Sequence, residues 1–154
     1  MKKVLLAVDD TKGAVRATEI LIKFYSAVKP EQVVLVYVEK MLGRSLVGEA
    51  LGTGPEMDEM RAALKDTDYQ QMLDKKAEKI IAYYTKMLND AGITAIKSVV
   101  KEGRPTDEIL ATAKEEAAEL IVIGSRGERR HDFLIGSVSR EVANTSPISV
   151  LLAR

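Results

Sequence analysis

The chain has 154 residues, and its charges balance at 23 Lys plus Arg against 23 Asp plus Glu. This length suits one domain spanning residues 1–154, and the balance gives no chain-wide electrostatic reason to expect nucleic acid or an anionic membrane as a partner. With no Cys and one His, the sequence excludes disulfides, thiolate nucleophiles and metal sites built on Cys or on several His.

Five short apolar runs are the predicted strands. Four of them are dense in Val, Ile and Leu without polar alternation, which is typical of parallel strands buried on both faces. The third run alternates more, which places it nearer an edge of the sheet. None approaches the roughly 20 residues of a membrane span, so we expect a cytoplasmic protein with no membrane partner. In chain order the runs are Val4–Val8, Val33–Val38, Ile93–Val100, Leu120–Ile123 and Ile148–Leu152.

Helical patterns lie between these runs. A second helix is predicted over 69–91 with a stop at Gly92, a third from Pro105 to Ala117, and a short fourth over 138–144. The first helix has apolar residues at steps of three and four, namely Ala14, Ala17, Leu21, Phe24 and Val28. Strands that alternate with helices predict an α/β fold, a parallel sheet wound in both directions with helices on both faces.

In such a sheet, ligands bind beyond the carboxyl ends of the strands, where the strand order reverses. Two polar segments are expected to meet there. One is Asp9-Asp10-Thr11, directly after the first strand, and the other is 124–139, directly after the fourth. A third segment, the glycine-rich stretch 40–57, predicts a long, mobile connection.

The segment 124–139 contains the parts of a phosphate cradle. Gly124 and Gly127 are expected to turn with positive φ and to let the backbone approach a ligand closely. Gly136-Ser137 opens a helix, whose unpaired N–H groups favour an anion. Side-chain donors and charges come from Ser137, Ser139, Arg126, Arg129 and Arg130.

Several segments together resemble the universal stress protein family over nearly the whole chain. Family members begin with a strand, an Asp, a small polar stretch and a helix, as Val4–Thr11 does. The segment Gly103–Leu110 resembles the family's Gly-x-Pro turn into its third helix. Glu119–Gly127 resembles the fourth strand and glycine turn, and Gly136–Val142 the last helix. The combination is specific, whereas each piece alone is a weak signal.

This resemblance implies a Rossmann-like fold of the adenine nucleotide alpha-hydrolase type, with five parallel strands in the order 3-2-1-4-5. It also implies a regulatory stress-response protein that binds ATP, with or without Mg²⁺, and hydrolyses it slowly at most. Asp9 would face the adenosine, and the backbone from Val36 to Val38 would line the adenine. Ribose and phosphates would be held by Gly124, Arg126, Gly127, Gly136, Ser137, Val138 and Ser139.

The resemblance also implies a homodimer. The last run, Ile148–Leu152, is expected to be an edge strand, and an exposed apolar edge favours pairing with a second copy of itself. ATP-binding members of the family commonly dimerise in this way. Ser149 and Arg154 could instead keep this edge soluble and the chain monomeric.

One spacing departs from the family's ATP motif, in which nine residues separate the second and third glycines. Here eight residues separate Gly127 from Gly136. In an irregular loop this difference changes the reach of the chain by at most about 3.5 Å, and the glycines can still converge. In a helical turn it would rotate the following side chains by about 100°, giving a stress protein that has lost nucleotide binding.

Other interpretations remain open. Asp9 and Asp10 could simply cap the first helix, and Arg129 and Arg130 could be solvated surface charge. An enzyme of the alpha-hydrolase group would usually show Ser-Gly-Gly-x-Asp-Ser after the first strand, or His-x-Gly-His, and neither is present. A flavodoxin-like flavin carrier is disfavoured by the lack of Trp. The sequence assigns no metal ligands.

Overall fold

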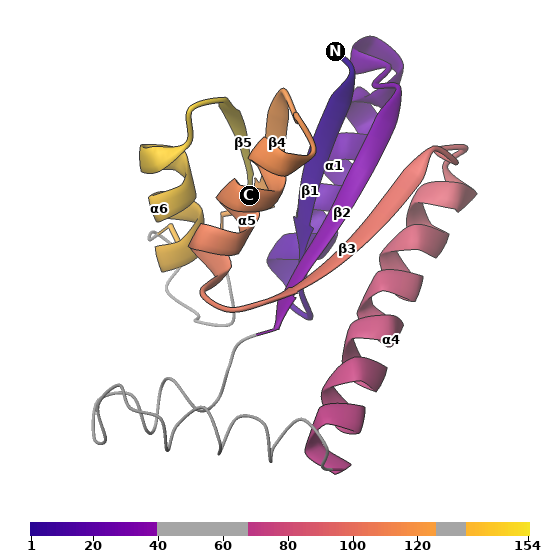
Figure 1. The fold of residues 1–154 in the computed structure, drawn as a ribbon. Coiled ribbons are helices and arrows are strands. Elements are labelled where there is room, and N and C mark those ends of the chain that lie inside the picture. The colour runs from indigo at the N-terminus through magenta and orange to yellow at the C-terminus, as the bar shows by residue number, and fades with distance from the viewer. Residues whose placement is uncertain (40–67, 126–134) are drawn as a thin grey trace.

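The structure, a computed structural model, describes residues 1–39, 68–125 and 135–154, where strands and helices alternate along the chain (Figure 1). The expected connection at 40–57 lies outside these residues. The elements are β1 (Lys3–Val8), α1 (Lys12–Val28), β2 (Gln32–Glu39), α4 (Asp68–Asp90), β3 (Ile96–Glu102), α5 (Pro105–Glu115), β4 (Leu120–Gly124), α6 (Ser137–Thr145) and β5 (Ser149–Ala153). Within the described ranges, no helix is both long enough and apolar enough to cross a membrane.

The strands form one sheet of five in the order β3-β2-β1-β4-β5, and every neighbouring pair is parallel. The predicted fold is therefore confirmed. At the centre, Leu5 of β1 lies opposite Val34 of β2 and Ile121 of β4. Because all strands run the same way, their carboxyl ends lie together at one end of the sheet, toward the lower part of Figure 1. The strand order reverses between β1 and β4.

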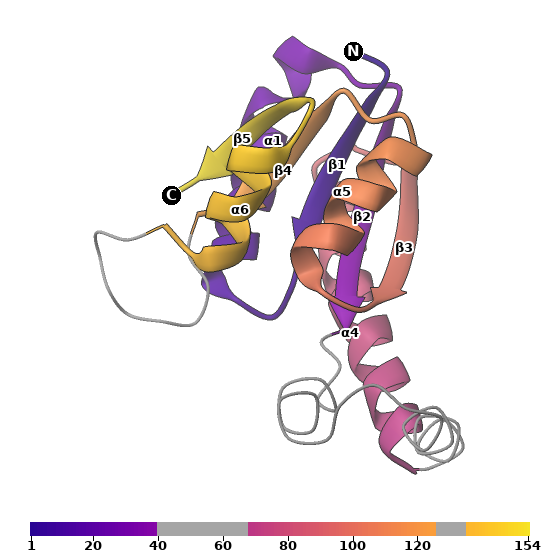
Figure 2. The ribbon, with the colours of Figure 1, turned by 60° about the vertical axis from the view of Figure 1, so that its left-hand side comes forward.

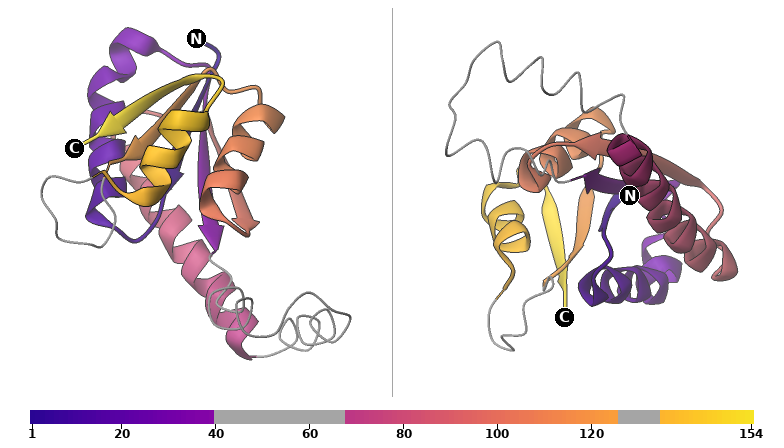
Figure 3. Two further views of the ribbon diagram at one scale, coloured as in Figure 1. Left: turned by 90° about the vertical axis from the view of Figure 1, so that its left-hand side faces the viewer. Right: turned by 90° about the horizontal axis from the view of Figure 1, so that it is seen from below.

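Helices cover both faces of the sheet (Figures 2 and 3). Leu6 of β1 packs into a cluster with Leu21 of α1 and Tyr84 of α4, whereas the neighbouring Leu5 packs on the other face with Ile109 of α5 and Val142 of α6. Consecutive strand residues point to opposite faces, so both must be apolar when both faces are covered. This explains the uninterrupted apolar run of β1.

The edge strands differ from the central ones as expected, with corrected boundaries. The alternating run does form an edge strand, but β3 begins at Ile96 and not at Ile93. The N–H of Ile93 instead donates to Leu88 O at 3.0 Å, which closes the end of α4, and its side chain is buried there. At the other edge, β5 begins at Ser149 because the N–H of Ile148 bonds the Ser146 hydroxyl.

Two helix predictions also need correction. Phe24 does not join the buried stripe of α1, since 52% of it is exposed. Instead Thr18 is fully buried, with its hydroxyl donating to Ala14 O. The third helix ends at Glu115, and Ala117 adopts the left-handed conformation with φ 52°. The N–H of Ala118 then donates to Ala113 O at 2.9 Å, so a helix-closing turn replaces the last predicted residues.

Candidate functional site

The turn after β1 is held by its own polar side chains. Asp9 Oδ1 accepts hydrogen bonds from the Thr11 N–H at 2.9 Å and from the Thr11 hydroxyl at 2.5 Å. Thr11 is the N-cap of α1 and accepts from the Ala14 N–H. The cap is thus Thr11, which rules out Asp9 and Asp10 as direct caps. Within the described part of the chain, no hydrogen bond reaches Asp9 Oδ2, so this oxygen can accept from a ligand.

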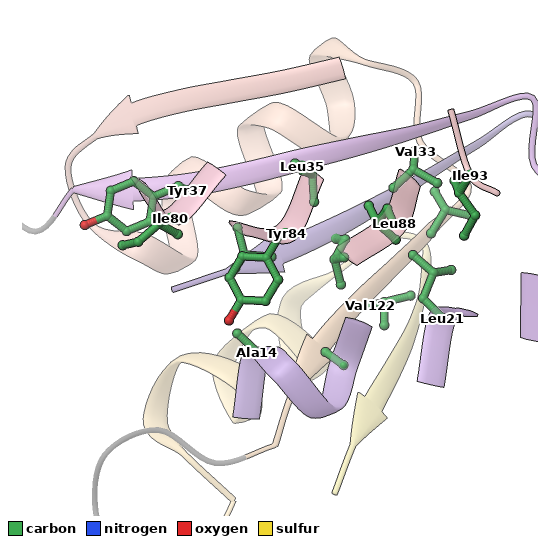
Figure 4. Packing of buried hydrophobic residues seen from close by; sticks show 14 of the residues in the cluster. Ala14, Leu21, Val33, Leu35, Tyr37, Ile80, Tyr84, Leu88, Ile93 and Val122 are labelled. Atoms are coloured by element: carbon green, nitrogen blue, oxygen red, sulfur yellow. The ribbon is translucent and has the colours of Figure 1, made fainter. Parts of the chain in front are cut away.

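The helix α4 contacts the same turn at two points. The buried hydroxyl of Tyr84 donates to the backbone oxygen of Asp9 at 2.8 Å, and Lys76 Nζ lies 2.7 Å from Asp10 Oδ2. Burial, followed by the nearby charge of Asp9, raises the pKa of Tyr84 well above its ordinary value. The tyrosine therefore stays protonated and donates. Figure 4 shows its ring in the core, with the hydroxyl toward Ala14.

The predicted contacts on β2 occupy different positions. The ladder between β1 and β2 ends at the pair Val8 and Tyr37, so Val38 is the first β2 residue beyond it, as Asp9 is on β1. Val36 lies inside the sheet, opposite Ala7 and Val99, with a buried side chain. A ligand at the carboxyl ends of the strands therefore meets the backbone of Val38 before that of Val36.

Gly124 ends β4 in close contact with the start of α1. A Cβ atom at this position would lie 2.4 Å from the backbone C and O atoms of Gly13. The expected positive φ is wrong, because among the described glycines only Gly92 and Gly103 adopt it. Gly124 is required here because two backbones touch. This contact places the end of β4 against the first turn of α1.

The start of α6 is tied back to the end of β4. The Gly136 N–H donates to Ser125 O at 2.7 Å, and the buried Ser139 hydroxyl lies 3.2 Å from the same oxygen and 3.1 Å from Gly136 O. The Ser139 hydroxyl therefore donates its proton to backbone oxygens of the chain. Its predicted role was to hold the ribose and phosphates of a ligand. Gly136 is the N-cap, and the described residues offer no acceptor to the N–H groups of Ser137 and Val138.

A family model described as the universal stress protein family matches residues 1–154. The chain belongs to the universal stress protein family. It is 28% identical over 160 residues to universal stress protein MJ0577 of Methanocaldococcus jannaschii, with 99% of this chain and 94% of that protein covered. It is also 28% identical over 155 residues to universal stress protein YxiE of Bacillus subtilis, with coverage of 99% and 98%.

Solved structures agree with this assignment. The structure of MJ0577 has a TM-score of 0.77 at 26% identity and covers 99% of this chain and 94% of its own. A universal stress protein from Archaeoglobus fulgidus in complex with dAMP has a TM-score of 0.64 at 21% identity, with coverage of 100% and 98%. A family protein from Arabidopsis thaliana with AMP bound has a TM-score of 0.64 at 18% identity, with coverage of 99% and 91%. These last two are similar in fold.

In this universal stress protein, some predicted site residues lie outside the described ranges. They are Arg126 and Gly127, together with Arg129 and Arg130. Conversely, Ser125 is not among the predicted site residues, yet its buried hydroxyl has no partner among the described residues. Its position directly after Gly124 is the only sequence signal for it. The described residues contain no group of three or more acidic or His side chains arranged to hold a metal ion.

An ion pair and a hydrogen bond of Glu141 join α6 to the start of α5. Glu141 accepts from Arg104 Nη2 at 2.5 Å and from the Thr106 hydroxyl at 3.1 Å. Arg104 is the N-cap residue of α5, where the Gly-x-Pro turn enters the helix. Because Glu141 lies one turn into α6, this contact sets the position of the helix whose first turn faces the strand ends.

Glu39 is a second residue near the site that is absent from the sequence-based predictions. It ends β2 with only 5% of its surface exposed, and Oε1 has no hydrogen-bond partner among the described residues. Burial raises the pKa of this carboxyl above its ordinary value, and the nearby charges of Asp74 and Glu102 raise it further. The end of β2 therefore carries a carboxyl group that resists ionisation more than an exposed glutamate does.

We expect Glu39→Gln to raise the free energy of unfolding at pH 7, with a gain that shrinks toward pH 4. Between the unfolded-state pKa, about 4.3, and the raised folded-state pKa, the folded protein holds more protons, so stability falls as pH rises. Gln cannot ionise and avoids that loss. Urea unfolding at several pH values measures it, with the exposed Glu31, directly before the same strand, changed to Gln as the control. A gain in the free energy of unfolding that is equal at pH 7 and at pH 4 would contradict this explanation.

Proposed function

We propose that this universal stress protein binds an adenine nucleotide, ATP in the first instance, at the carboxyl ends of β1, β2 and β4. It would act in the cytoplasm as a regulatory stress-response module with at most slow ATP hydrolysis. The supporting observation is the close contact of Gly124 with Gly13 at the point where the strand order reverses. In doubly wound sheets this point is the usual nucleotide position.

Each part of the nucleotide has a matching group. Asp9 Oδ2 and the backbone of Val38 suit the adenosine, because both residues lie just beyond the last pair of the ladder that joins β1 to β2. The N–H groups of Ser137 and Val138 open a nine-residue helix and suit the phosphates. Arg126 and Gly127 belong to this proposal through the family motif. Mg²⁺ would be held mainly by the phosphates and water, as it commonly is in nucleotide sites.

Related proteins support the proposal. The universal stress proteins from Archaeoglobus fulgidus and Arabidopsis thaliana, described above, were solved with dAMP and AMP. Both ligands share an adenine base and a phosphate. The proposal therefore assigns the adenosine and the first phosphate to this site and leaves ATP, ADP and AMP to be ranked by measurement.

We also propose that the protein forms a homodimer, in which the two copies pair through β5. This strand is an edge of the sheet, and Val150, Leu151 and Leu152 on it are only partly buried within the chain. Apolar side chains on an open strand edge favour pairing with a second strand, and twofold symmetry makes that pairing antiparallel.

We expect the wild type to bind at least one of ATP, ADP and AMP below millimolar concentration, and Asp9→Asn to weaken binding about tenfold or more, roughly 1.4 kcal/mol. Asn still has an oxygen that can accept from Thr11 but lacks the charge at the ligand side. Isothermal titration calorimetry measures both proteins. Asp90→Asn, a change at the exposed end of α4, is the control and should leave affinity unchanged.

Two results would overturn the proposed function. One is a wild type that binds none of the three nucleotides at millimolar concentration, as a stress protein that has lost nucleotide binding would behave. The other is an Asp9→Asn variant with wild-type affinity, which would place the nucleotide away from β1. Mass spectrometry of small molecules released from protein purified without added nucleotide gives an independent answer.

A further inference from the structure

Tyr84 is a buried residue of α4 that reaches the carboxyl ends of the strands, where the proposed site lies. It is 1% exposed, and its hydroxyl donates to the backbone oxygen of Asp9, a residue 75 positions away, at 2.8 Å. We propose that Tyr84 is a positioning residue for nucleotide binding, whose hydroxyl fixes the Asp9 backbone and thereby aims the Asp9 carboxylate at the adenosine. This inference rests on the function proposed above.

The core sets the position of the hydroxyl. The Tyr84 ring packs edge-on against Tyr83, with centroids 5.0 Å apart and ring planes at 85°. It belongs to the same buried cluster as Leu35 of β2 and Ala14 of α1 (Figure 4). A ring so enclosed cannot follow a moving turn, because protein interiors are close-packed. The turn after β1 must therefore adjust to the tyrosine.

The geometry of Asp9 explains how this contact acts on the carboxylate. Tyr84 holds the backbone oxygen of Asp9, while Thr11 holds Oδ1 through two hydrogen bonds. With both fixed, the remaining oxygen, Oδ2, has one orientation. Without the tyrosine hydroxyl, the peptide unit between Asp9 and Asp10 loses a buried partner and can rotate, and the carboxylate rotates with it. The ion pair between Lys76 and Asp10 is half-exposed and holds the turn less firmly.

The adjacent tyrosines offer a matched pair of variants. Tyr84→Phe and Tyr83→Phe each remove one oxygen atom from the same helix, but Tyr83 is exposed. We expect Tyr84→Phe to weaken AMP and ATP binding about fivefold or more in calorimetry, and Tyr83→Phe to change it less than about twofold. Urea unfolding of each variant confirms that the protein titrated is folded.

Two further measurements separate positioning from a general loosening of the fold. Adenosine and inorganic tripolyphosphate each compete with a fluorescent ATP analogue. Tyr84→Phe should weaken competition by adenosine and leave competition by tripolyphosphate unchanged, because Asp9 is assigned to the adenosine. In an Asp9→Asn background, Tyr84→Phe should have no further effect, since a residue that acts through Asp9 has nothing left to aim.

The outcomes distinguish this inference from the proposed function. A wild type that binds nucleotide, together with a Tyr84→Phe variant of equal affinity, overturns the positioning role alone. An equal loss of adenosine and tripolyphosphate binding also overturns it, as does a full additional loss in the Asp9→Asn background. A wild type that binds no adenine nucleotide overturns the proposed function, and the positioning role with it.

Discussion

Replacing Gly124 by Ala is expected to lower the free energy of unfolding by about 3 kcal/mol and to abolish nucleotide binding. The added Cβ would lie 2.4 Å from the backbone C and O atoms of Gly13. Neither segment can yield easily, because Gly124 is paired in the sheet with Ala153 and Gly13 lies in the first turn of α1. Chemical unfolding and calorimetry with ATP measure the two effects.

Gly92→Ala is the matched control for this prediction. Gly92 has a positive φ of 81°, but a Cβ there would meet no atom within 4 Å. Only conformational strain applies, so we expect a loss of about 1 kcal/mol and unchanged nucleotide affinity. If Gly124→Ala proves no more harmful than Gly92→Ala, close backbone contact is not what requires glycine at the end of β4.

Replacing Val150 by Lys is expected to convert the proposed dimer into a monomer. Val150 lies in the edge strand β5, near its middle and opposite Ile121 of β4. In an antiparallel pair of β5 strands whose twofold axis passes near residue 150, the two lysines would lie close together and repel each other. Light scattering at micromolar concentration should report a dimer mass for the wild type and a monomer mass for the variant.

The opposite edge of the sheet supplies the control. Val100 lies on β3, the other edge strand, and is 48% exposed. Val100→Lys makes the same chemical change on an edge to which no partner is assigned, so the dimer mass should persist. A wild type that is monomeric at micromolar concentration refutes the dimer. If Val150→Lys and Val100→Lys have the same mass in light scattering, the assignment of the dimer interface to β5 is refuted.

The sheet could be predicted from sequence because burial on both faces leaves a clear pattern. Leu5 and Leu6 pack into different clusters, and only a central parallel strand needs two apolar neighbours in that way. The strand boundaries could not be predicted in the same way, since apolar character does not distinguish a strand residue from one that closes a helix. Ile93 is buried as firmly as any strand residue, yet its N–H bonds Leu88 at the end of α4.

The candidate site was only partly predictable. Asp9 and Gly124 follow strands directly, so their place at the edge of the sheet follows from topology. The reason for glycine at 124 did not, because close contact with Gly13 depends on how α1 packs against β4. Tyr84 and Glu39 carry no local signal, since one acts across 75 residues and the other resembles an ordinary strand-end glutamate until its burial is known.

The backbone hydrogen bonds of Ser125 have a consequence for loop length. The Ser125 N–H donates to Ala153 O, and Ser125 O accepts from Gly136, so the segment between them leaves and returns at fixed points. The start of α6 is thus tied to the end of β4, while the contact between Glu141 and Arg104 holds its second turn. With eight residues between Gly127 and Gly136 in the sequence, α6 therefore still begins at a point held against the end of β4.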